Sequence, residues 1–334
     1  MRIRGRNLCH AIAPPVAAPA PARAAAFAAE NRSDFRAWQA NGRAAFRRAL
    51  GPPPAKVPLR VARVERRVFK DYVREKIVFD VEQNLAAAAW VCAPRTHGQS
   101  RLPAILCCHG LGPGKDPLVG LFDGETCLEY HKLVAVRLAQ RGFITLTPDR
   151  RGFGDCSAAP RGYPTVQHLQ ALDAYYRRTR RTPLLALDIR DGVRALDVLA
   201  KRGDVDATRI GCLGVMDGGA VAAGVAALDP RIGAASLVSL ASDRPAVPGP
   251  SQMGPEWAWG SVGLCGLICP RPLQVQSPDA DYFIPLARAK RAARQVQRFY
   301  ALRGAPANFQ HHVFDGVTEI DIPAAAEWME AHLR

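Results

Sequence analysis

Residues 208–230 are TRIGCLGVMDGGAVAAGVAALDP. The apolar run Ile210–Leu213 predicts a short buried strand, and the alanine-rich run Ala220–Leu228 predicts a helix packed closely on a sheet. Gly214–Gly219, between them, is rich in glycine, as a strained turn that passes close to neighbouring backbone requires. The stretch therefore predicts a strand, a sharp turn and a helix in direct succession.

This succession has the Gly-x-nucleophile-x-Gly-Gly spacing of the nucleophile elbow of α/β-hydrolases. In this register the nucleophile position is Met216, whose thioether has no proton to lose and cannot attack an acyl group. A shift of one residue would put Asp217 there, but Val215 would then fill a position that needs a small residue. We therefore interpret Asp217 as a solvated or turn-stabilising carboxylate, and keep it as a possible alternative nucleophile.

Composition sets broad limits on the class of protein. The 334 residues can bury a large core, and 48% of them are hydrophobic, without an apolar run long enough to cross a bilayer. The net charge is +15, which we attribute to an arginine-rich solvated surface rather than to a nucleic-acid site. Only Arg177, Arg178, Arg180 and Arg181 form a tight basic cluster, without interleaved aromatic residues.

The nine cysteines are an odd number and form no Cys-x-x-Cys pair, so neither a zinc site nor a redox pair is indicated. We predict a reducing compartment and a cytoplasmic location. The first 26 residues contain an Ala/Pro run interrupted by Arg23, which is a poor signal-peptide core. A degenerate export signal stays open as the alternative.

Two regions are expected along the chain. Residues 1–58 comprise a disordered Ala/Pro-rich segment over 1–26, an amphipathic helix over Glu30–Leu50, and a proline-rich linker. Residues 59–334 form one domain in which strands and helices alternate. The expected strands are Arg63–Phe69, Val73–Val81, Ala86–Ala93, Pro103–Cys108, Phe143–Pro148, Ile210–Leu213, Ala234–Leu240, Ile268–Gln276 and Phe309–Phe314.

The expected helices of the domain are Tyr130–Arg141, Leu184–Lys201, Ala220–Leu228, Leu286–Tyr300 and Ala324–Leu333, and Ser242–Gly266 is an expected loop with Trp257 and Trp259. The first two strands of the domain are expected to be antiparallel. The later alternation predicts an α/β fold: a mostly parallel, doubly wound sheet with helices on both faces.

The order of the motifs along residues 60–334 resembles the α/β-hydrolase superfamily, and within it the bacterial acetyl xylan esterase-like and dienelactone hydrolase-like proteins. The motifs that carry the resemblance are His109-Gly110, Asp149-Arg-Arg-Gly152-Phe-Gly154, Asp188, the elbow, Pro270-Arg271-Pro272-Leu273, Asp279-Ala-Asp281 and Phe314-Asp315-Gly316. Members of this family hydrolyse carboxylic esters with a Ser–Asp–His triad and without a cofactor.

The resemblance implies a role for each matching position. The nucleophile falls on Met216, the acid on Asp281 with Asp279 as a nearby substitute, and the histidine on Thr318. A hydroxyl does not titrate near neutral pH, so Thr318 cannot act as general base. The oxyanion-binding backbone is expected at His109-Gly110 and at Asp217.

We therefore predict a catalytically inactive or impaired homologue that binds a small-molecule ester or an acylated sugar, or serves as an interaction module. The alternative is an active ester hydrolase that uses Asp217 with His311 or His312. A dinucleotide loop at Gly211, Gly214 and Gly218 is disfavoured because the spacing is not Gly-x-Gly-x-x-Gly. We expect no cofactor, no metal, no nucleic acid and no membrane partner, and the sequence makes no prediction of oligomeric state.

Overall fold

The structure is a computed structural model that describes residues 2–3, 6–7, 32–95, 100–121, 129–159, 163–242 and 260–334. The predicted disorder over residues 1–26 lies outside this range, apart from the antiparallel pair β1 (Arg2–Ile3) and β2 (Arg6–Asn7). Trp257 and Trp259 also lie outside the described residues.

One mixed sheet forms the centre of the described structure, with the strand order β11-β10-β9-β8-β6-β7-β5-β4-β3. Its strands from β6 to β11 run parallel, while β3, β4 and β5 pair antiparallel at one side, and β5 is also antiparallel to β7. The strands are β3 (Ala62–Val68), β4 (Tyr72–Glu82), β5 (Leu85–Pro94), β6 (Leu102–Cys108), β7 (Ile144–Pro148), β8 (Val205–Val215), β9 (Ile232–Val238), β10 (Leu273–Pro278) and β11 (Phe309–Phe314).

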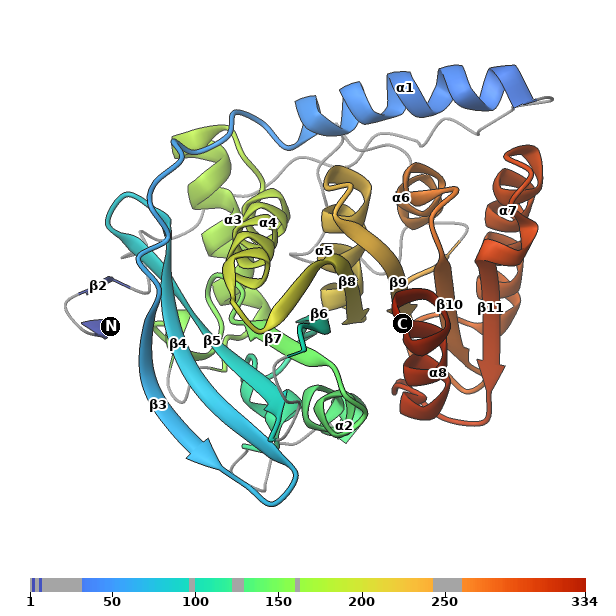
Figure 1. The fold of residues 1–334 in the computed structure, drawn as a ribbon. Helices are drawn as coiled ribbons and strands as arrows, with labels where there is room; N and C mark the ends of the chain where they lie inside the picture. The colour runs from blue at the N-terminus through green and yellow to red at the C-terminus, as the bar shows by residue number, and fades with distance from the viewer. Residues whose placement is uncertain are drawn as a thin grey trace.

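Helices cover both faces of this sheet (Figure 1). The helices are α1 (Arg32–Ala49), α2 (Val134–Gln140), α3 (Val166–Arg180), α4 (Leu184–Lys201), α5 (Asp217–Leu228), α6 (Gly260–Ile268), α7 (Leu286–Leu302) and α8 (Ile322–Leu333). One core cluster unites the sheet with α1, α4, α5, α6 and α7, and a second unites its other face with α2 and α8. The predicted fold class, a mostly parallel doubly wound sheet with an N-terminal helix and antiparallel strands, is confirmed.

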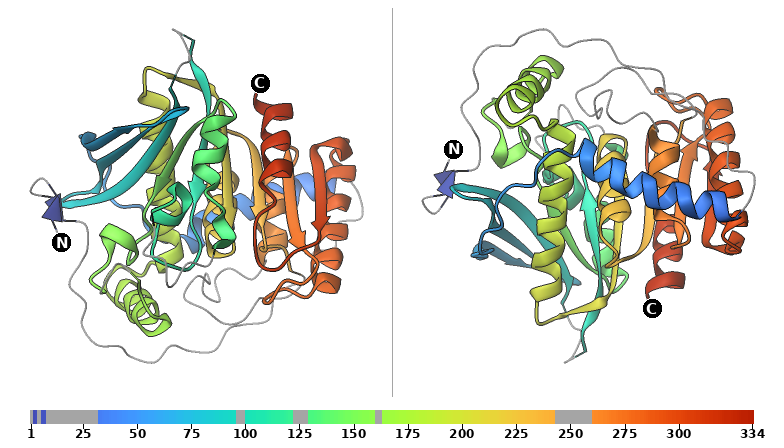
Figure 2. Two further views of the ribbon diagram at one scale, coloured as in Figure 1. Left: turned by 90° about the horizontal axis from the view of Figure 1, so that it is seen from below. Right: turned by 90° about the horizontal axis from the view of Figure 1, so that it is seen from above.

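Helix α1 lies across the layer formed by α5, α6 and α7, as the right-hand view of Figure 2 shows. The helix is amphipathic, as predicted, and its buried face includes Phe35, Phe46 and Ala49. Phe35 is fully buried and stacks on Phe299 of α7, with ring centroids 5.0 Å apart. The buried amide of Gln39 donates to the carbonyl oxygens of Gly266 and Cys269, both at 2.7 Å. The helix therefore packs as part of the folded domain.

The prediction for residues 242–276 was wrong in part. Gly260–Ile268 forms helix α6 instead of a loop end, and the following strand begins only at Leu273. Periodicity cannot separate a short buried helix from a buried strand, and seven of the nine residues of α6 are buried. Pro270 and Pro272 carry no backbone N–H for a sheet ladder, so the strand starts after them.

Two other helices differ from the prediction. The segment expected to be helical from Tyr130 becomes α-helical only at Val134, because Leu133 has a left-handed backbone with φ of 60°. Helix α3 was not predicted, and its last turn carries the arginine cluster. None of the helices in the described ranges combines the length and apolarity needed to span a membrane.

Candidate active site

The elbow lies between β8 and α5. Strand β8 ends at Val215 and α5 begins at Asp217, so Met216 alone forms the apex. Its φ of 53° and ψ of −118° lie outside the regions that residues with a side chain usually adopt. Its N–H donates to the carbonyl oxygen of Val238 on β9, at 2.9 Å. A strained residue thus stands at the carboxyl end of the central strand, presenting a half-buried thioether.

Two glycines make this turn possible. A Cβ atom at Gly214 would lie 2.2 Å from the carbonyl oxygen of Gly218. A Cβ atom at Gly218 would lie 2.2 Å from the carbonyl oxygen of Cys108, at the end of β6. Both distances are far inside van der Waals contact with backbone atoms, which cannot move aside. The glycine spacing in the sequence therefore reports the close approach of β8, α5 and β6 at the elbow.

The loops after β10 and β11 meet at Asp281 and Thr318. The Thr318 hydroxyl donates to Asp281 Oδ1 at 3.2 Å and accepts the N–H of Tyr282 at 3.1 Å. The same carboxylate oxygen accepts the N–H groups of Phe283 at 2.8 Å and Ile284 at 3.0 Å. The residues predicted at the acid and histidine positions are therefore hydrogen-bonded partners, and Thr318 is only 7% exposed.

Asp279, the nearby substitute for the acid, has a different task. Its Oδ1 accepts the N–H of Gly316 at 3.2 Å, and its own N–H donates to the carbonyl oxygen of Phe314 at 2.9 Å. Asp279 therefore joins the two loops through their backbones.

The two histidines of β11 are engaged with other side chains. His311 Nε2 lies 3.1 Å from Ser277 Oγ, and His312 Nε2 lies 2.8 Å from Asp321 Oδ2. Strand β11 is separated from β8 by β10 and β9, which at ~4.8 Å per strand places it roughly 14 Å away. Asp217, in the first turn of α5, is therefore not brought together with either histidine by the sheet.

The His109-Gly110 turn follows β6, as predicted, but its donors are already used. His109 Nε2 accepts the N–H of Arg150 at 3.0 Å, so its Nδ1 carries the proton and donates to the carbonyl oxygen of Gly110 at 2.8 Å. Burial lowers the pKa of His109 well below its usual value, and Arg150 lowers it further. His109 is therefore a neutral loop-shaping residue.

The expectation for Gly110 needs correction. Its backbone N–H donates to Nε2 of the buried His131 at 3.1 Å, so it is not free to bind an oxyanion in this conformation. Burial lowers the pKa of His131 to about 3, which keeps the ring neutral and able to accept. The backbone N–H of Asp217 belongs to the first turn of α5, where N–H groups have no partner within the helix. The sequence offered no motif around His131 from which this contact could be predicted.

The Asp149 motif has a structural role, because Asp149 binds Lys115 through two hydrogen bonds. Asp149 Oδ1 accepts the N–H of Lys115 at 2.9 Å, and Oδ2 accepts Lys115 Nζ at 2.7 Å. A Cβ atom at Gly114 or Gly154 would lie within 2.4 Å of Asp149 Oδ1. Burial alone would lower the pKa of Lys115, but Asp149, Asp116 and Asp155 together raise it above its usual value. Lys115, which sequence reasoning missed, therefore fixes the loop after β6 to the end of β7.

Asp188, singled out in the sequence, anchors the segment that follows β7 to α4. Its Oδ2 accepts from Arg150 Nε and its Oδ1 from the N–H of Arg151, both at 3.0 Å. Arg151 Nε in turn pairs with Asp191 at 2.7 Å, one turn further along the helix. These buried pairs hold the segment that orients His109 and with it the backbone beneath the elbow.

Comparison with known proteins agrees with this geometry. A family model described as "Abhydrolase family" matches residues 17–169. The "Putative hydrolase YtaP" of Bacillus subtilis is 30% identical over 192 residues, which cover 55% of this chain and 58% of that protein. An uncharacterized protein of Pseudomonas aeruginosa is 25% identical over 157 residues, covering 47% of this chain and 34% of the other. The chain thus spans less than two thirds of either curated relative.

Solved structures share the whole fold at low identity. A "putative acetyl xylan esterase" of Bacteroides fragilis has a TM-score of 0.68 and 20% identity, with 85% of this chain and 76% of that chain covered. A glucuronoyl esterase of Solibacter usitatus has a TM-score of 0.65 and 14% identity, with 94% and 98% covered. These likenesses concern the fold alone.

The sheet order, the elbow and the loops after β10 and β11 define a protein with the α/β-hydrolase fold. The family model over residues 17–169 supports an α/β-hydrolase-like chain, and its fold resembles that of a xylan esterase.

Proposed function

We propose that this protein is a catalytically silent or strongly impaired α/β-hydrolase that binds a small ester or an acylated sugar. The observation that supports the proposal is the residue type at two positions that the resemblance assigns to the nucleophile and the base. Met216 occupies the strained apex of the elbow, and Thr318 occupies the place beside Asp281 where the resemblance puts a histidine.

The chemistry of the two side chains supports this proposal. A thioether has no acidic proton, so Met216 cannot form the acyl intermediate of a serine esterase. A threonine hydroxyl does not titrate near neutral pH and cannot take a proton from a nucleophile. In a serine protease, losing the nucleophile or the base alone reduces turnover about 10⁶-fold. Asp281 is hydrogen-bonded to Thr318 and, on this proposal, has no imidazole to orient.

A turnover assay tests the proposal. Purified protein is given p-nitrophenyl acetate beside a heat-denatured control and the variants Asp217→Ala and Asp281→Ala. We expect the rate of the native protein to equal that of the control, and any residual rate to be shared by both variants, as a contaminant's would be. Turnover that disappears in either variant would overturn the proposal and support an active hydrolase with rearranged residues.

The ligand and the location form a second part of the proposal. Acetylated sugars are the first probes for calorimetric titration, because the resemblance is to acetyl xylan esterases. We propose the cytoplasm as the compartment, on the odd number of cysteines in the sequence. Binding of an acetylated sugar without its hydrolysis is the expected result.

A further inference from the structure

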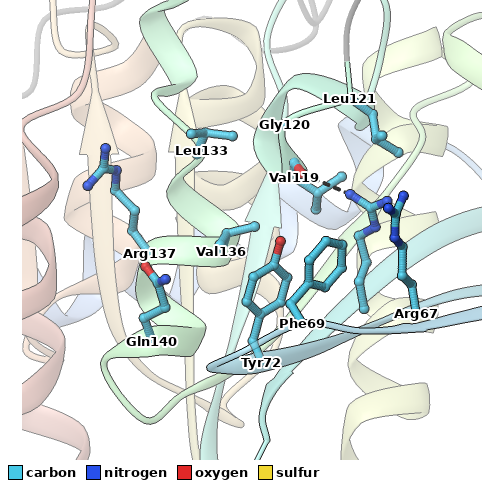
Figure 3. Close-up of a pocket in the computed structure, with 11 residues that line it drawn as sticks. Arg67, Phe69, Tyr72, Val119, Gly120, Leu121, Leu133, Val136, Arg137 and Gln140 are labelled. Carbon is cyan, nitrogen blue, oxygen red and sulfur yellow. Dashed lines mark hydrogen bonds between the residues drawn. The ribbon is translucent and has the colours of Figure 1, made fainter.

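We propose a second binding site, for a small aromatic carboxylate, in a cavity of about 520 Å³ between the β3–β4 hairpin and α2. We call it the arginine pocket. Its key residues are Arg67, Phe69, Tyr72, Arg74 and Arg137, and Figure 3 shows the cavity with most of its lining labelled. The loop that follows the 3-10 helix η1 (Asp116–Val119) closes one side.

The arginine pocket is separate from the candidate active site. Neither Met216, Asp217, Asp281 nor Thr318 lines it. Tyr72 pairs with Pro94 at the far end of β5, beyond the pair that Cys92 forms with Thr145 at the start of β7. The pocket therefore lies near the N-terminal ends of the parallel strands, whereas the elbow lies at their C-terminal ends.

Two arginines face each other across the hairpin. Arg67 on β3 and Arg74 on β4 are direct cross-strand partners. Both guanidinium groups lie 5.2 Å from the centroid of the Phe69 ring. Like charges in this arrangement destabilise a strand pair, because each raises the potential at the other. An anion between or beside them would remove that repulsion.

Arg74 provides the strongest indication of a missing partner. It is 4% exposed, and its buried Nε atom has no hydrogen-bond partner. One terminal nitrogen donates to the carbonyl oxygen of Val119 at 3.1 Å, and the guanidinium lies 4.8 Å from the centroid of the Trp90 ring. A buried charge without a counter-charge is costly, and none of the eleven residues that line the pocket is acidic.

The remaining walls suit a flat apolar group. The Phe69 and Tyr72 rings stack with centroids 4.4 Å apart and an angle of 6° between their planes (Figure 3). Leu121 after η1, Leu133 at the N-cap of α2 and Val136 on α2 supply aliphatic surface. A carboxylate matches the fork of a guanidinium, and an aromatic ring is stabilised by stacking on other rings. The volume lies within the range of small-molecule sites.

Calorimetric titration of the full chain tests this site with 2-naphthoate as the probe. The neutral 2-naphthamide and inorganic phosphate serve as comparison ligands. We expect naphthoate to bind saturably and both comparison ligands to bind at least about tenfold more weakly, since one lacks the charge and the other the ring. The readout is binding, so it does not depend on whether the protein hydrolyses esters.

Matched variants assign the binding to the pocket. Arg67→Gln removes a lining charge on an exposed side chain, and Arg66→Gln removes the neighbouring charge, which lies on the other face of β3 and pairs with Glu75 at 3.7 Å. We expect Arg67→Gln to weaken naphthoate binding about tenfold or more and Arg66→Gln to leave it within about twofold. Absence of saturable naphthoate binding, equal binding of either comparison ligand, or equal effects of the two variants would overturn the proposal.

Discussion

The hydroxyl of Thr318 donates to Oδ1 of Asp281 across 3.2 Å, and so joins the loop after β11 to the loop after β10. The resemblance to α/β-hydrolases assigns the histidine of the triad to the loop after β11 and the acid to the loop after β10. The third position, Met216, stands on the elbow after β8 with the backbone angles of a strained turn. On our proposal, Met216 and Thr318 are the unreactive replacements for the nucleophile and the base of an esterase site.

The close approach of backbone atoms at Gly218 predicts a loss of stability when this residue gains a side chain. We expect Gly218→Ala to lower the free energy of unfolding by about 3 kcal/mol, because its Cβ would lie 2.2 Å from the backbone oxygen of Cys108. Gly203→Ala is the control, since a Cβ there meets no atom within 4 Å and should change stability by less than about 0.5 kcal/mol. Urea denaturation measures both values. Equal stability of the two variants would contradict this account of the glycine spacing.

Backbone strain at Met216 predicts an unusual order of stability between two truncations. Met216→Ala and Met216→Gly both remove the packing of the thioether against the second core cluster. Only glycine adopts a φ of 53° and a ψ of −118° without strain. We expect the glycine variant to be about 1 kcal/mol more stable than the alanine variant. Thermal denaturation compares them, and a more stable alanine variant would argue against strain at this residue.

The buried His131 predicts a loss of stability in acid. Burial lowers its pKa from 6.5 to about 3. Between about pH 6.5 and pH 3, the imidazole is therefore protonated in the unfolded chain and neutral in the native protein. The free energy of unfolding therefore falls as the pH drops from about 6.5 to about 3, by up to about 1.4 kcal/mol per pH unit from this residue. Stability is fully retained above that window.

His131→Gln isolates this contribution, because an amide oxygen can still accept the N–H of Gly110 but does not titrate. We expect a shallower pH dependence in urea denaturation between pH 6.5 and 4 than in the unmodified protein. His332→Gln removes a half-buried histidine near the C-terminus. It should change the pH dependence of stability less, because burial lowers the pKa of His332 less than that of His131. Identical slopes for His131→Gln and the unmodified protein would contradict the prediction.

Sequence patterns located most of the fold because most elements are unambiguous. Helix α4 begins and ends at the predicted Leu184 and Lys201, and β11 at Phe309 and Phe314. Both have clear periodicity or a compact strand pattern bounded by turn residues. Helix α6 was missed because a short buried helix and a buried strand are alike in hydrophobicity.

The candidate site was only partly predictable for a different reason. The elbow depends on local spacing, which the sequence records directly. The contacts of Lys115 with Asp149 and of His131 with Gly110 join segments that only the folded protein brings together. No short motif marks these contacts. The arginine-rich composition suggested a solvated basic surface and gave no sign that Arg74 is buried.

The account rests on the two substituted positions, and covalent labelling tests them most directly. A fluorophosphonate probe is applied to the unmodified protein, to the double variant Met216→Ser with Thr318→His, and to Met216→Ala with Thr318→His as the matched control, with the labelled peptide identified by mass spectrometry. We predict labelling at position 216 in the first double variant and none in the other two proteins. Labelling of the unmodified protein at another residue, or no difference between the two folded double variants, would contradict the assignment of Met216 and Thr318 to the nucleophile and base positions.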